Sequence, residues 1–242
     1  MRKSMRLDQL LAARGAGSRK EVSALVRAGL VCVNGEVVRR AERKIDPARD
    51  CVTLRGEAVD LREHVYIMLH KPQGVVSASR DAKDATVLDL LPQKLRRRGL
   101  FPVGRLDKDT TGLLLITDDG ALLHTLLSPR RHVPKVYLVT LKAPATQSDA
   151  AAFAAGLVLS DGEICLPAEL IPLEGNMARV VLHEGKFHQV KRMFAKLGNE
   201  VLVLHRESMG GLSLDESLAP GACRELSEKE LQLLKQSAPL PR

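Results

Sequence analysis

Hydrophobic residues in the first thirty positions recur with helical spacing. This pattern predicts two short helices within Met5–Gly29, separated by a glycine-rich break at residues 15–17. Ser18 is placed to cap the second helix, and Glu21 stands three residues later in the capping-box position. The apolar faces of the two helices are formed by Leu7, Leu10, Leu11, Val22, Leu25 and Val26.

A β pattern replaces the helical one after Gly29. Leu30–Val33 and Glu36–Val38 read as two strands joined by a tight Asn34-Gly35 turn, and Asp50–Leu54 continues the pattern. A linker is expected around Gly56–Glu63. We therefore predict a small helix–helix–hairpin domain over residues 1–62, followed by a second domain over residues 63–236.

The second domain mixes apolar strands and amphipathic helices without a regular β-α-β repeat. An α+β fold with a mixed, mainly antiparallel sheet is therefore expected. The predicted strands are Val65–Leu69, Leu100–Val103, Leu113–Thr117, Val136–Leu141, Ala178–Leu182 and Val201–His205. The predicted helices are Thr86–Leu91, Ser148–Ala155 and Val190–Leu197, and the residues after Lys235 are expected to fray.

Charge changes this picture by suggesting a partner. The chain of 242 residues carries a net charge of +8, and residues 1–44 hold eleven Lys and Arg against four Asp and Glu. Such an excess suits a polyanion, and it marks the N-terminal domain as the region that contacts phosphates. The four cysteines have no metal-ligand spacing, and no signal peptide or membrane span is visible. A cytoplasmic protein without a metal site is expected.

The most informative segment is the polar loop Gly104–Gly120. It places Arg105, Asp107 and Asp109 between a short strand and the apolar run Leu113–Ile116, and Asp118-Asp119-Gly120 reads as a turn. From the residues alone, these charges indicate either structural ion pairs or a catalytic carboxylate in a basic cleft. Residue types and spacing leave both interpretations open.

The order of residues in this loop resembles a family signature. Gly-Arg-Leu-Asp-x-x-Thr-x-Gly-Leu-Leu-Leu-Ile-Thr-x-Asp-Gly is similar to the motif of the pseudouridine synthases that modify ribosomal RNA. Two distant segments also match that family, Lys135-Val136-Tyr137 and His183–Phe194. The N-terminal domain resembles the alpha-L RNA-binding domain through Met5–Asp8, Ser18-Arg19 and the Val31–Gly35 turn, so the resemblance covers nearly the whole chain.

The resemblance implies a role for each matching residue. Asp107 is implied as the essential catalytic group, Tyr137 as the ring that stacks on the target base, and Lys191 as the cation paired with Asp107. Such a cation lowers the pKa of a carboxyl group and holds it in position. The candidate RNA-binding residues are Arg105, Arg192, Arg19, Lys20, Arg27, Lys71, His188 and Gln189. The reaction is an isomerisation, so no metal or nucleotide cofactor is expected.

Within the family, the chain most resembles the small-subunit type. The run Leu204–Gly211 supports this assignment, although its Arg206-Glu207 pair is also interpretable as a surface ion pair. The alternatives are a large-subunit enzyme of the same family, a non-catalytic ribosome-assembly protein and a different RNA enzyme such as a methyltransferase. The chain has no glycine-rich nucleotide-binding loop, which disfavours the methyltransferase. The expected partner is ribosomal RNA or a subunit assembly intermediate, bound by a monomer.

Overall fold

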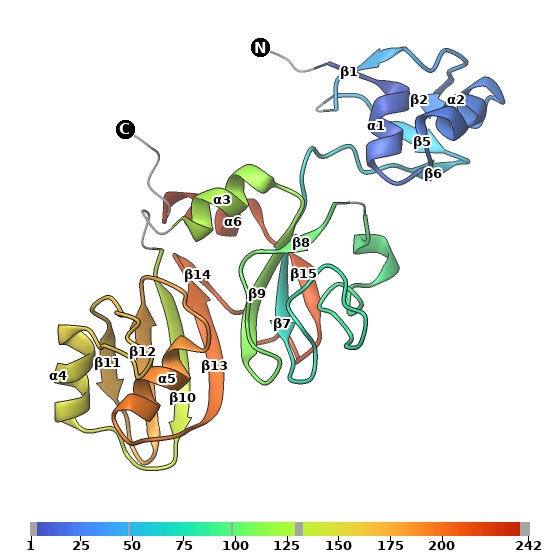
Figure 1. The fold of residues 1–242 in the computed structure, drawn as a ribbon. Coiled ribbons are helices and arrows are strands. Elements are labelled where there is room, and N and C mark those ends of the chain that lie inside the picture. The colour runs from blue at the N-terminus through green and yellow to red at the C-terminus, as the bar shows by residue number, and fades with distance from the viewer. Residues whose placement is uncertain (1–3, 48, 98, 129–132, 238–242) are drawn as a thin grey trace. The chain divides into compact units, whose positions relative to one another are not determined.

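The computed structural model describes residues 4–47, 49–97, 99–128 and 133–237, and it divides into two compact units (Figure 1). The first unit comprises residues 1–65 together with 93–100, and the second comprises 66–92 together with 101–242. The expected boundary after residue 62 lies close to this division, but the inclusion of residues 93–100 in the first unit was not foreseen. Within the described ranges, no helix is both long and apolar enough to cross a membrane.

The first unit packs two helices against a small sheet. Helix α1 (Leu7–Ala13) is followed by α2 (Arg19–Arg27), and both halves of the Ser18–Glu21 capping box form as predicted. The sheet has the order β3-β2-β5-β6, from β2 (Val31–Val33), β3 (Glu36–Val37), β5 (Val52–Leu54) and β6 (Glu57–Ala58). Strands β1 (Met5–Arg6) and β4 (Lys44–Ile45) form a separate antiparallel pair.

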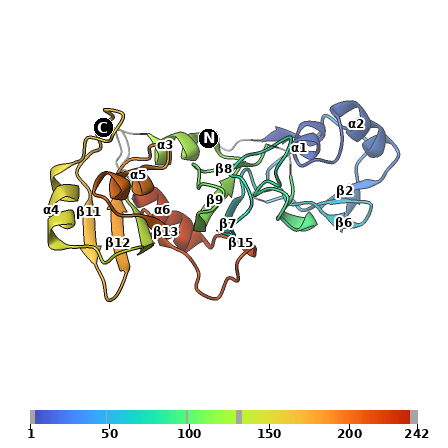
Figure 2. The same ribbon diagram turned by 60° about the horizontal axis from the view of Figure 1, so that its bottom comes forward.

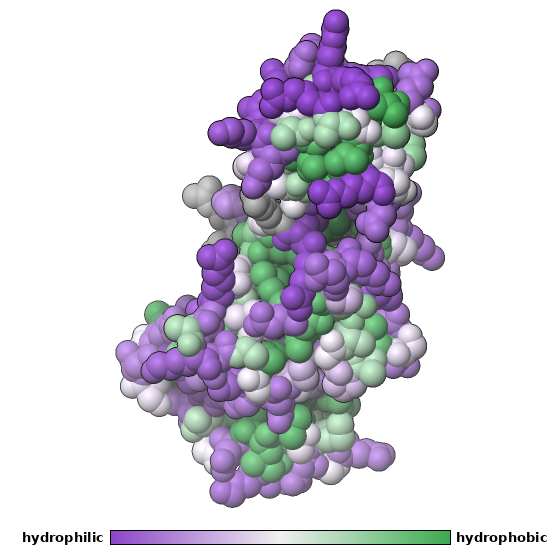
Figure 3. Space-filling view, turned by 90° about the vertical axis from the view of Figure 1, so that its right-hand side faces the viewer, coloured by the Kyte–Doolittle hydropathy of each residue, from purple (hydrophilic) through white to green (hydrophobic). Residues whose placement is uncertain are grey.

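The helical leucines and the strand valines of the first unit form one aliphatic core. Leu7, Leu10 and Leu11 are completely buried, as are Val22 and Val26 of the second helix. This burial explains why both helices are short but stable, because tertiary packing supplies most of the stability of such segments. On the face that Figure 3 presents, hydrophilic side chains predominate over this unit, which is at the top of the view.

The second unit is built on a nine-stranded sheet whose main path is β11-β12-β10-β13-β9-β7-β15. Most neighbouring strands are antiparallel, but β9 and β13 are parallel and pair through only two residue pairs. This parallel pair joins the β11-β12-β10-β13 part of the sheet to the β9-β7-β15 part. We call this pair the seam. The strands are β7 (Tyr66–Lys71), β8 (Phe101–Pro102), β9 (Thr111–Thr117), β10 (Lys135–Leu141), β11 (Glu169–Pro172), β12 (Met177–Leu182), β13 (Val201–Met209), β14 (Leu212–Ser213) and β15 (Cys223–Glu225).

Helices α3 (Gly120–Leu127) and α6 (Glu228–Gln236) contribute to a core on one side of the seam. Leu122 and Leu126 of α3 and Leu234 of α6 pack with Met68 and Leu115 of the sheet. The Asp119 side chain accepts hydrogen bonds from the amides of Ala121 and Leu122 and so caps α3. The predicted turn at Asp118–Gly120 is therefore the beginning of a helix that the sequence reasoning missed.

On the other side of the seam, α4 (Gln147–Ala155) lies beside β11, and α5 (Gln189–Lys196) packs near β13 (Figures 1 and 2). The rings of Phe153 and Phe194 are fully buried and lie 5.0 Å apart between their centroids. Such tilted aromatic pairs stabilise a core beyond the area that they bury. Both helices were predicted from their spacing, with each boundary within one residue of the observed one.

One expectation about local structure was wrong, and a second falls mostly outside the described residues. Residues 86–91 form turns and no helix, because the backbone around Thr86 pairs with Val76 in an isolated bridge, in which the Val87 amide donates to the Val76 carbonyl. The bonds that follow are those of single turns, from the Asp89 amide to the Thr86 carbonyl and from the Leu91 amide to the Leu88 carbonyl. The residues after Lys235 were expected to fray; the helix that begins after Ser227 ends at Gln236, and residues 238–242 lie outside the described residues.

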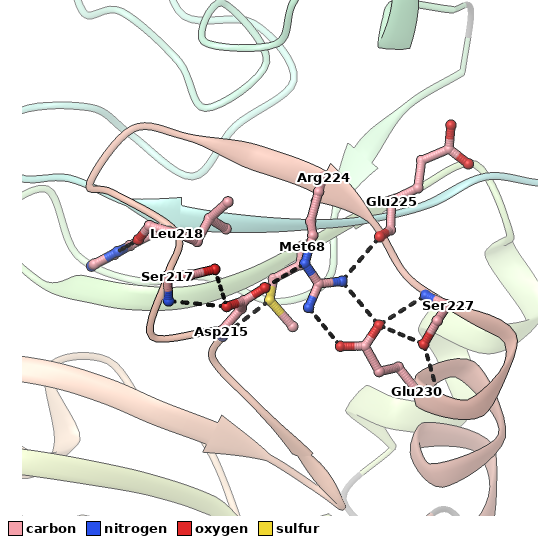
Figure 4. A network of polar contacts seen from close by, with 9 residues as sticks. Met68, Asp215, Ser217, Leu218, Arg224, Glu225, Ser227 and Glu230 are labelled. Carbon is pink, nitrogen blue, oxygen red and sulfur yellow. Dashed lines mark hydrogen bonds and ion pairs between the residues drawn. The ribbon is translucent and has the colours of Figure 1, made fainter.

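A polar network attaches α6 to strand β15 (Figure 4). The Arg224 guanidinium donates to Asp215 at 2.7 Å and makes two bonds to Glu230, at 2.7 and 2.9 Å. Hydrogen bonds from Ser217 and Arg224 lower the pKa of Asp215 to about 2, and Arg224 lowers the pKa of Glu230 to about 2. Both carboxylates therefore favour the folded state while they remain ionised.

We expect the stability supplied by this network to disappear in acid. A carboxyl whose pKa is depressed by folding contributes fully above its unfolded pKa of about 4 and loses that contribution as the pH falls toward its folded value near 2. Arg224→Met should therefore lower the melting temperature at about pH 6 and have little effect near pH 2. Thermal melts of both proteins across this range measure the difference. A difference that stays constant with pH would contradict the assignment.

Candidate active site

The loop that carries Asp107 connects β8 to β9 and is held by the segment that follows β7. The Ser77 hydroxyl donates to the carbonyl of Leu106 at 2.8 Å and accepts from its amide at 3.0 Å. The Gly74 amide donates to the Lys108 carbonyl, and the Thr110 amide closes a turn on the Asp107 carbonyl. These bonds fix the backbone on both sides of Asp107.

Lys71 also holds the loop that carries Asp107. It was expected to bind RNA, but it is completely buried, and its Nζ donates to the carbonyls of Pro72, Lys108 and Thr110. Burial lowers the pKa of Lys71 to about 8, and the charges of Asp109 and Asp107 oppose that shift. A group without solvent access cannot contact a phosphate, so we reassign Lys71 to holding the loop in place.

Asp107 lies beside two basic side chains. Lys191 Nζ is 3.4 Å from Asp107 Oδ2 and 2.6 Å from Asp109 Oδ1, so the lysine bridges the two carboxylates. His188 Nε2 is 3.5 Å from the other oxygen of Asp107. The hydrogen bond from Lys191 lowers the pKa of Asp109. Asp107 remains about a quarter exposed, so its carboxylate is both positioned and accessible.

A pocket of about 420 Å³ opens next to Asp107. Strands β10 and β13 contribute Tyr137 and Arg206, which stand opposite each other in the antiparallel register and so point to the same face. Tyr137 is 8% exposed. Lys135, two residues before Tyr137, also lines the pocket, and burial lowers its pKa to about 8. The structure therefore brings Asp107 and Tyr137 into one pocket.

Arg206 is a buried part of this pocket, so the interpretation of Arg206-Glu207 as a surface ion pair was wrong. Arg206 is 2% exposed, and its Nε donates to the carbonyl of Leu113 across the seam. Glu207 pairs with Arg179 instead. A side chain at Gly112 would place its Cβ 2.3 Å from the Arg206 carbonyl oxygen, so glycine permits this close approach of β9 and β13.

The segment His183–Phe194 supplies a further wall of the pocket that contains Asp107 and Tyr137. The side chain of Gln189 lines the pocket but is only 4% exposed. It donates a hydrogen bond to Glu184 and accepts one from the Lys186 amide. Arg192 was expected to bind RNA, yet it lines neither pocket that contains Asp107. Its guanidinium is occupied by two carboxylates and a carbonyl, those of Asp161, Glu163 and Phe187. Its observed role is to brace the wall.

The remaining predicted residues lie at two places. Arg105 is exposed and lines the pocket beside Asp107. Arg19, Lys20 and Arg27 are exposed on α2 of the first unit. Arg19 also forms an ion pair of 3.0 Å with the buried carboxylate of Asp8, which ties α2 to α1.

Three features of the site were not predicted from the sequence. His188 was expected only as an RNA contact, although it lies next to Asp107. Neither the pairing of Asp109 with Lys191 nor the position of Arg206 in the pocket was expected. The position of Asp109 two residues after Asp107 was an available signal, whereas the inward orientation of Arg206 depends on strand register. Among the described residues, no group of three or more His, Cys, Asp and Glu side chains is placed to hold a metal ion.

Comparison with known proteins identifies both units of the chain. The RNA pseudouridylate synthase family matches residues 65–196, and the S4 domain matches residues 5–50. An uncharacterized RNA pseudouridine synthase of Bacillus subtilis is 48% identical over 236 residues, which are 96% of this chain and 99% of that protein. Ribosomal small subunit pseudouridine synthase A of Escherichia coli is 42% identical over 228 residues, covering 94% of this chain and 98% of that protein.

A solved structure supports the same relationship. The crystal structure of a pseudouridylate synthase matches with a TM-score of 0.67 and 39% sequence identity, covering 96% of this chain and all of that one. The similarity in sequence and the similarity in structure therefore both extend over nearly the whole chain.

Proposed function

Since this chain belongs to the RNA pseudouridylate synthase family and carries an S4 domain at its N-terminus, we propose that it converts one uridine of small-subunit ribosomal RNA to pseudouridine. We propose further that it acts in the cytoplasm, as a monomer, on ribosomal RNA or on a subunit assembly intermediate. The Escherichia coli relative is named for the small subunit, and its similarity extends through both domains.

The observation that carries the proposal is the placement of Asp107. Its carboxylate is fixed by the loop backbone, flanked by Lys191 at 3.4 Å and accessible from a pocket that also contains Tyr137. An ionised carboxylate next to an aromatic side chain suits a reaction at the sugar or base of a nucleotide that has been flipped into the pocket.

The proposed reaction rearranges the nucleotide without a co-reactant. The C1′–N1 bond breaks, and its electron pair leaves with the uracil. The base rotates, C5 bonds to C1′, the proton on C5 is lost and N1 gains a proton. Asp107 is the proposed catalytic group at the sugar or base, and Tyr137 is the proposed stacking partner of the base. Arg105, at the mouth of the pocket, is proposed to hold a phosphate or fill the space of the flipped base.

The S4 domain is the proposed RNA anchor. Arg19, Lys20 and Arg27 are exposed along α2, and residues 1–44 hold all of the excess positive charge of this domain. Such domains bind structured RNA by shape and phosphate contacts. A pure RNA-binding protein is less well supported, because it has no use for a carboxylate positioned in a pocket by Lys191.

Mapping pseudouridine after incubation with purified protein tests the proposal. The substrates are unmodified small-subunit RNA, large-subunit RNA and reconstituted assembly intermediates, each carrying tritium at C5 so that release of label reports the reaction. We expect one modified position, in small-subunit RNA. A site only in large-subunit RNA would reassign the substrate within the family, and modification of neither RNA would overturn the proposed function.

Lys191 is expected to position and activate Asp107 without being the reacting group. Lys191→Gln should therefore lower kcat by about 10²-fold with a small change in KM, because the substrate still binds while the carboxylate loses its main cation. Lys191→Arg should recover part of the loss and retain the wild-type pH profile. Single-turnover rates across the pH range measure both effects. Equal kcat values for wild type and Lys191→Gln would contradict the assigned role.

A further inference from the structure

Phe187 is an exposed aromatic side chain at the mouth of the catalytic pocket. The chain has only four Phe and two Tyr residues, and Phe187 exposes 69% of its surface while lining the same pocket as Asp107 and Tyr137. Phe153 and Phe194, by contrast, are completely buried. An apolar ring left in water beside a polar catalytic loop invites a functional explanation.

The ring is stacked on a second aromatic side chain. The centroids of Phe187 and His188 lie 3.8 Å apart, and their planes are inclined by 18°. His188 adopts a left-handed backbone conformation with φ of 48°, which is unusual for a residue other than glycine. Its imidazole also lies 3.5 Å from Asp107. The stack therefore connects the exposed ring to the catalytic carboxylate.

The loop that presents this stack is braced on both sides. Arg192 donates to the Phe187 carbonyl at 3.0 Å, and its guanidinium is fixed by the carboxylates of Asp161 and Glu163. On the other side, the Lys186 amide donates to Gln189, whose own amide group donates to Glu184. This network fixes the backbone of Phe187, so little conformational entropy is lost when a ligand contacts its ring.

We propose that the Phe187–His188 stack is a platform for the unpaired base next to the target uridine in the RNA strand. This inference rests on the proposed function. A uridine that enters the pocket loses its stacking with its neighbours, and an adjacent aromatic face offers one neighbour a replacement. Every base has a π-face, so such a platform binds without reading hydrogen-bond donors and acceptors. The short link between adjacent nucleotides suits two stacking sites at the same pocket, Tyr137 within it and Phe187 at its mouth.

Substitution of Phe187 tests the platform directly. Stacking of one base on an aromatic side chain corresponds to a factor of about 5 to 150 in binding. We therefore expect Phe187→Ala to raise KM about tenfold with little change in kcat, Phe187→Tyr to restore KM, and Phe187→Leu to leave it high. Leu202→Ala removes another exposed apolar side chain, 56% exposed on β13, and serves as the matched control. Thermal melts establish that all four variants fold like wild type.

RNA substrates with an abasic site on either side of the mapped uridine identify the base involved. With wild-type protein, one of the two abasic substrates should show a KM about tenfold higher. With Phe187→Ala, the same abasic site should add little, because the contact is already absent and the two changes are coupled. An unchanged KM for Phe187→Ala, or an abasic penalty equal in both proteins, would overturn the platform. Absence of pseudouridine with wild-type protein would instead count against the proposed function.

Discussion

Asp107→Asn is expected to abolish pseudouridine formation, with a loss of at least about 10⁴-fold in single-turnover rate. The substitution keeps the size and shape of the side chain but removes its negative charge. The loop should keep its conformation, because Ser77, Gly74 and Lys71 hold it through backbone atoms. Release of tritium from C5-labelled RNA measures the loss.

The same variant should bind RNA almost as well as the wild type does. Filter binding is expected to change by no more than about threefold, because the phosphate contacts proposed for the S4 domain do not involve Asp107. Asp109→Asn is the matched control, since Asp109 is a second carboxylate paired with Lys191 but is 68% exposed and does not line the pocket that Asp107 shares with Tyr137. Retention of full activity by Asp107→Asn would remove this residue from the mechanism.

Gly112→Ala is expected to cause a large loss of stability in the second unit. The new Cβ would lie 2.3 Å from the carbonyl oxygen and 2.6 Å from the amide nitrogen of Arg206, both backbone atoms. Gly112 also has φ of +106°, a conformation that alanine rarely adopts. Strain and overpacking together cost about 3 kcal/mol or more, which corresponds to about 6–12 °C in melting temperature for a unit of this size.

Gly120→Ala provides the control for this experiment. Gly120 has no atom within 4 Å of an added Cβ and begins α3, where alanine is well tolerated. Its melting temperature should stay within about 2 °C of wild type or rise slightly. Scanning calorimetry resolves the transition of the catalytic unit from that of the S4 domain. Equal melting temperatures for Gly112→Ala and wild type would show that β9 and β13 separate easily.

Local patterns predicted the regular elements well where one segment determines its own structure. The Ser18 capping box, the Asn34-Gly35 turn and the periodic faces of α1 and α2 depend on residues close in sequence. Residues 86–91 do not form a helix, because Thr86 pairs with Val76, ten positions earlier in the chain, and the local pattern does not reveal that partner. Helix α3 was not predicted, because the sequence Asp118-Asp119-Gly120 is equally typical of a turn and of the start of a helix.

The candidate site divides in the same way. Asp107, Tyr137 and Lys191 were identified by resemblance to a family motif, and Asp107 and Tyr137 line one pocket, with Lys191 beside Asp107. The burial of Lys71 and Arg206 was not foreseen, because basic residues are rarely buried and only the register of β7, β9 and β13 takes them inside. The occupation of Arg192 by Asp161 and Glu163 likewise depends on contacts about thirty positions apart.

The seam between β9 and β13 has a consequence for exchanging parts among related enzymes. Asp107, the proposed catalytic group, lies in the loop that leads into β9, and Tyr137, the proposed stacking residue, lies on β10, so each portion of the sheet supplies part of the proposed active site. The ladder between β9 and β13 consists of two residue pairs, one of which is Gly112 with Arg206. A chimaera that takes the two portions from different parents therefore needs a glycine at position 112 from one parent and an arginine at position 206 from the other. If the two portions do not match at these positions, the chimaera would contain both parts of the proposed active site, but Asp107 and Tyr137 would be wrongly aligned with each other.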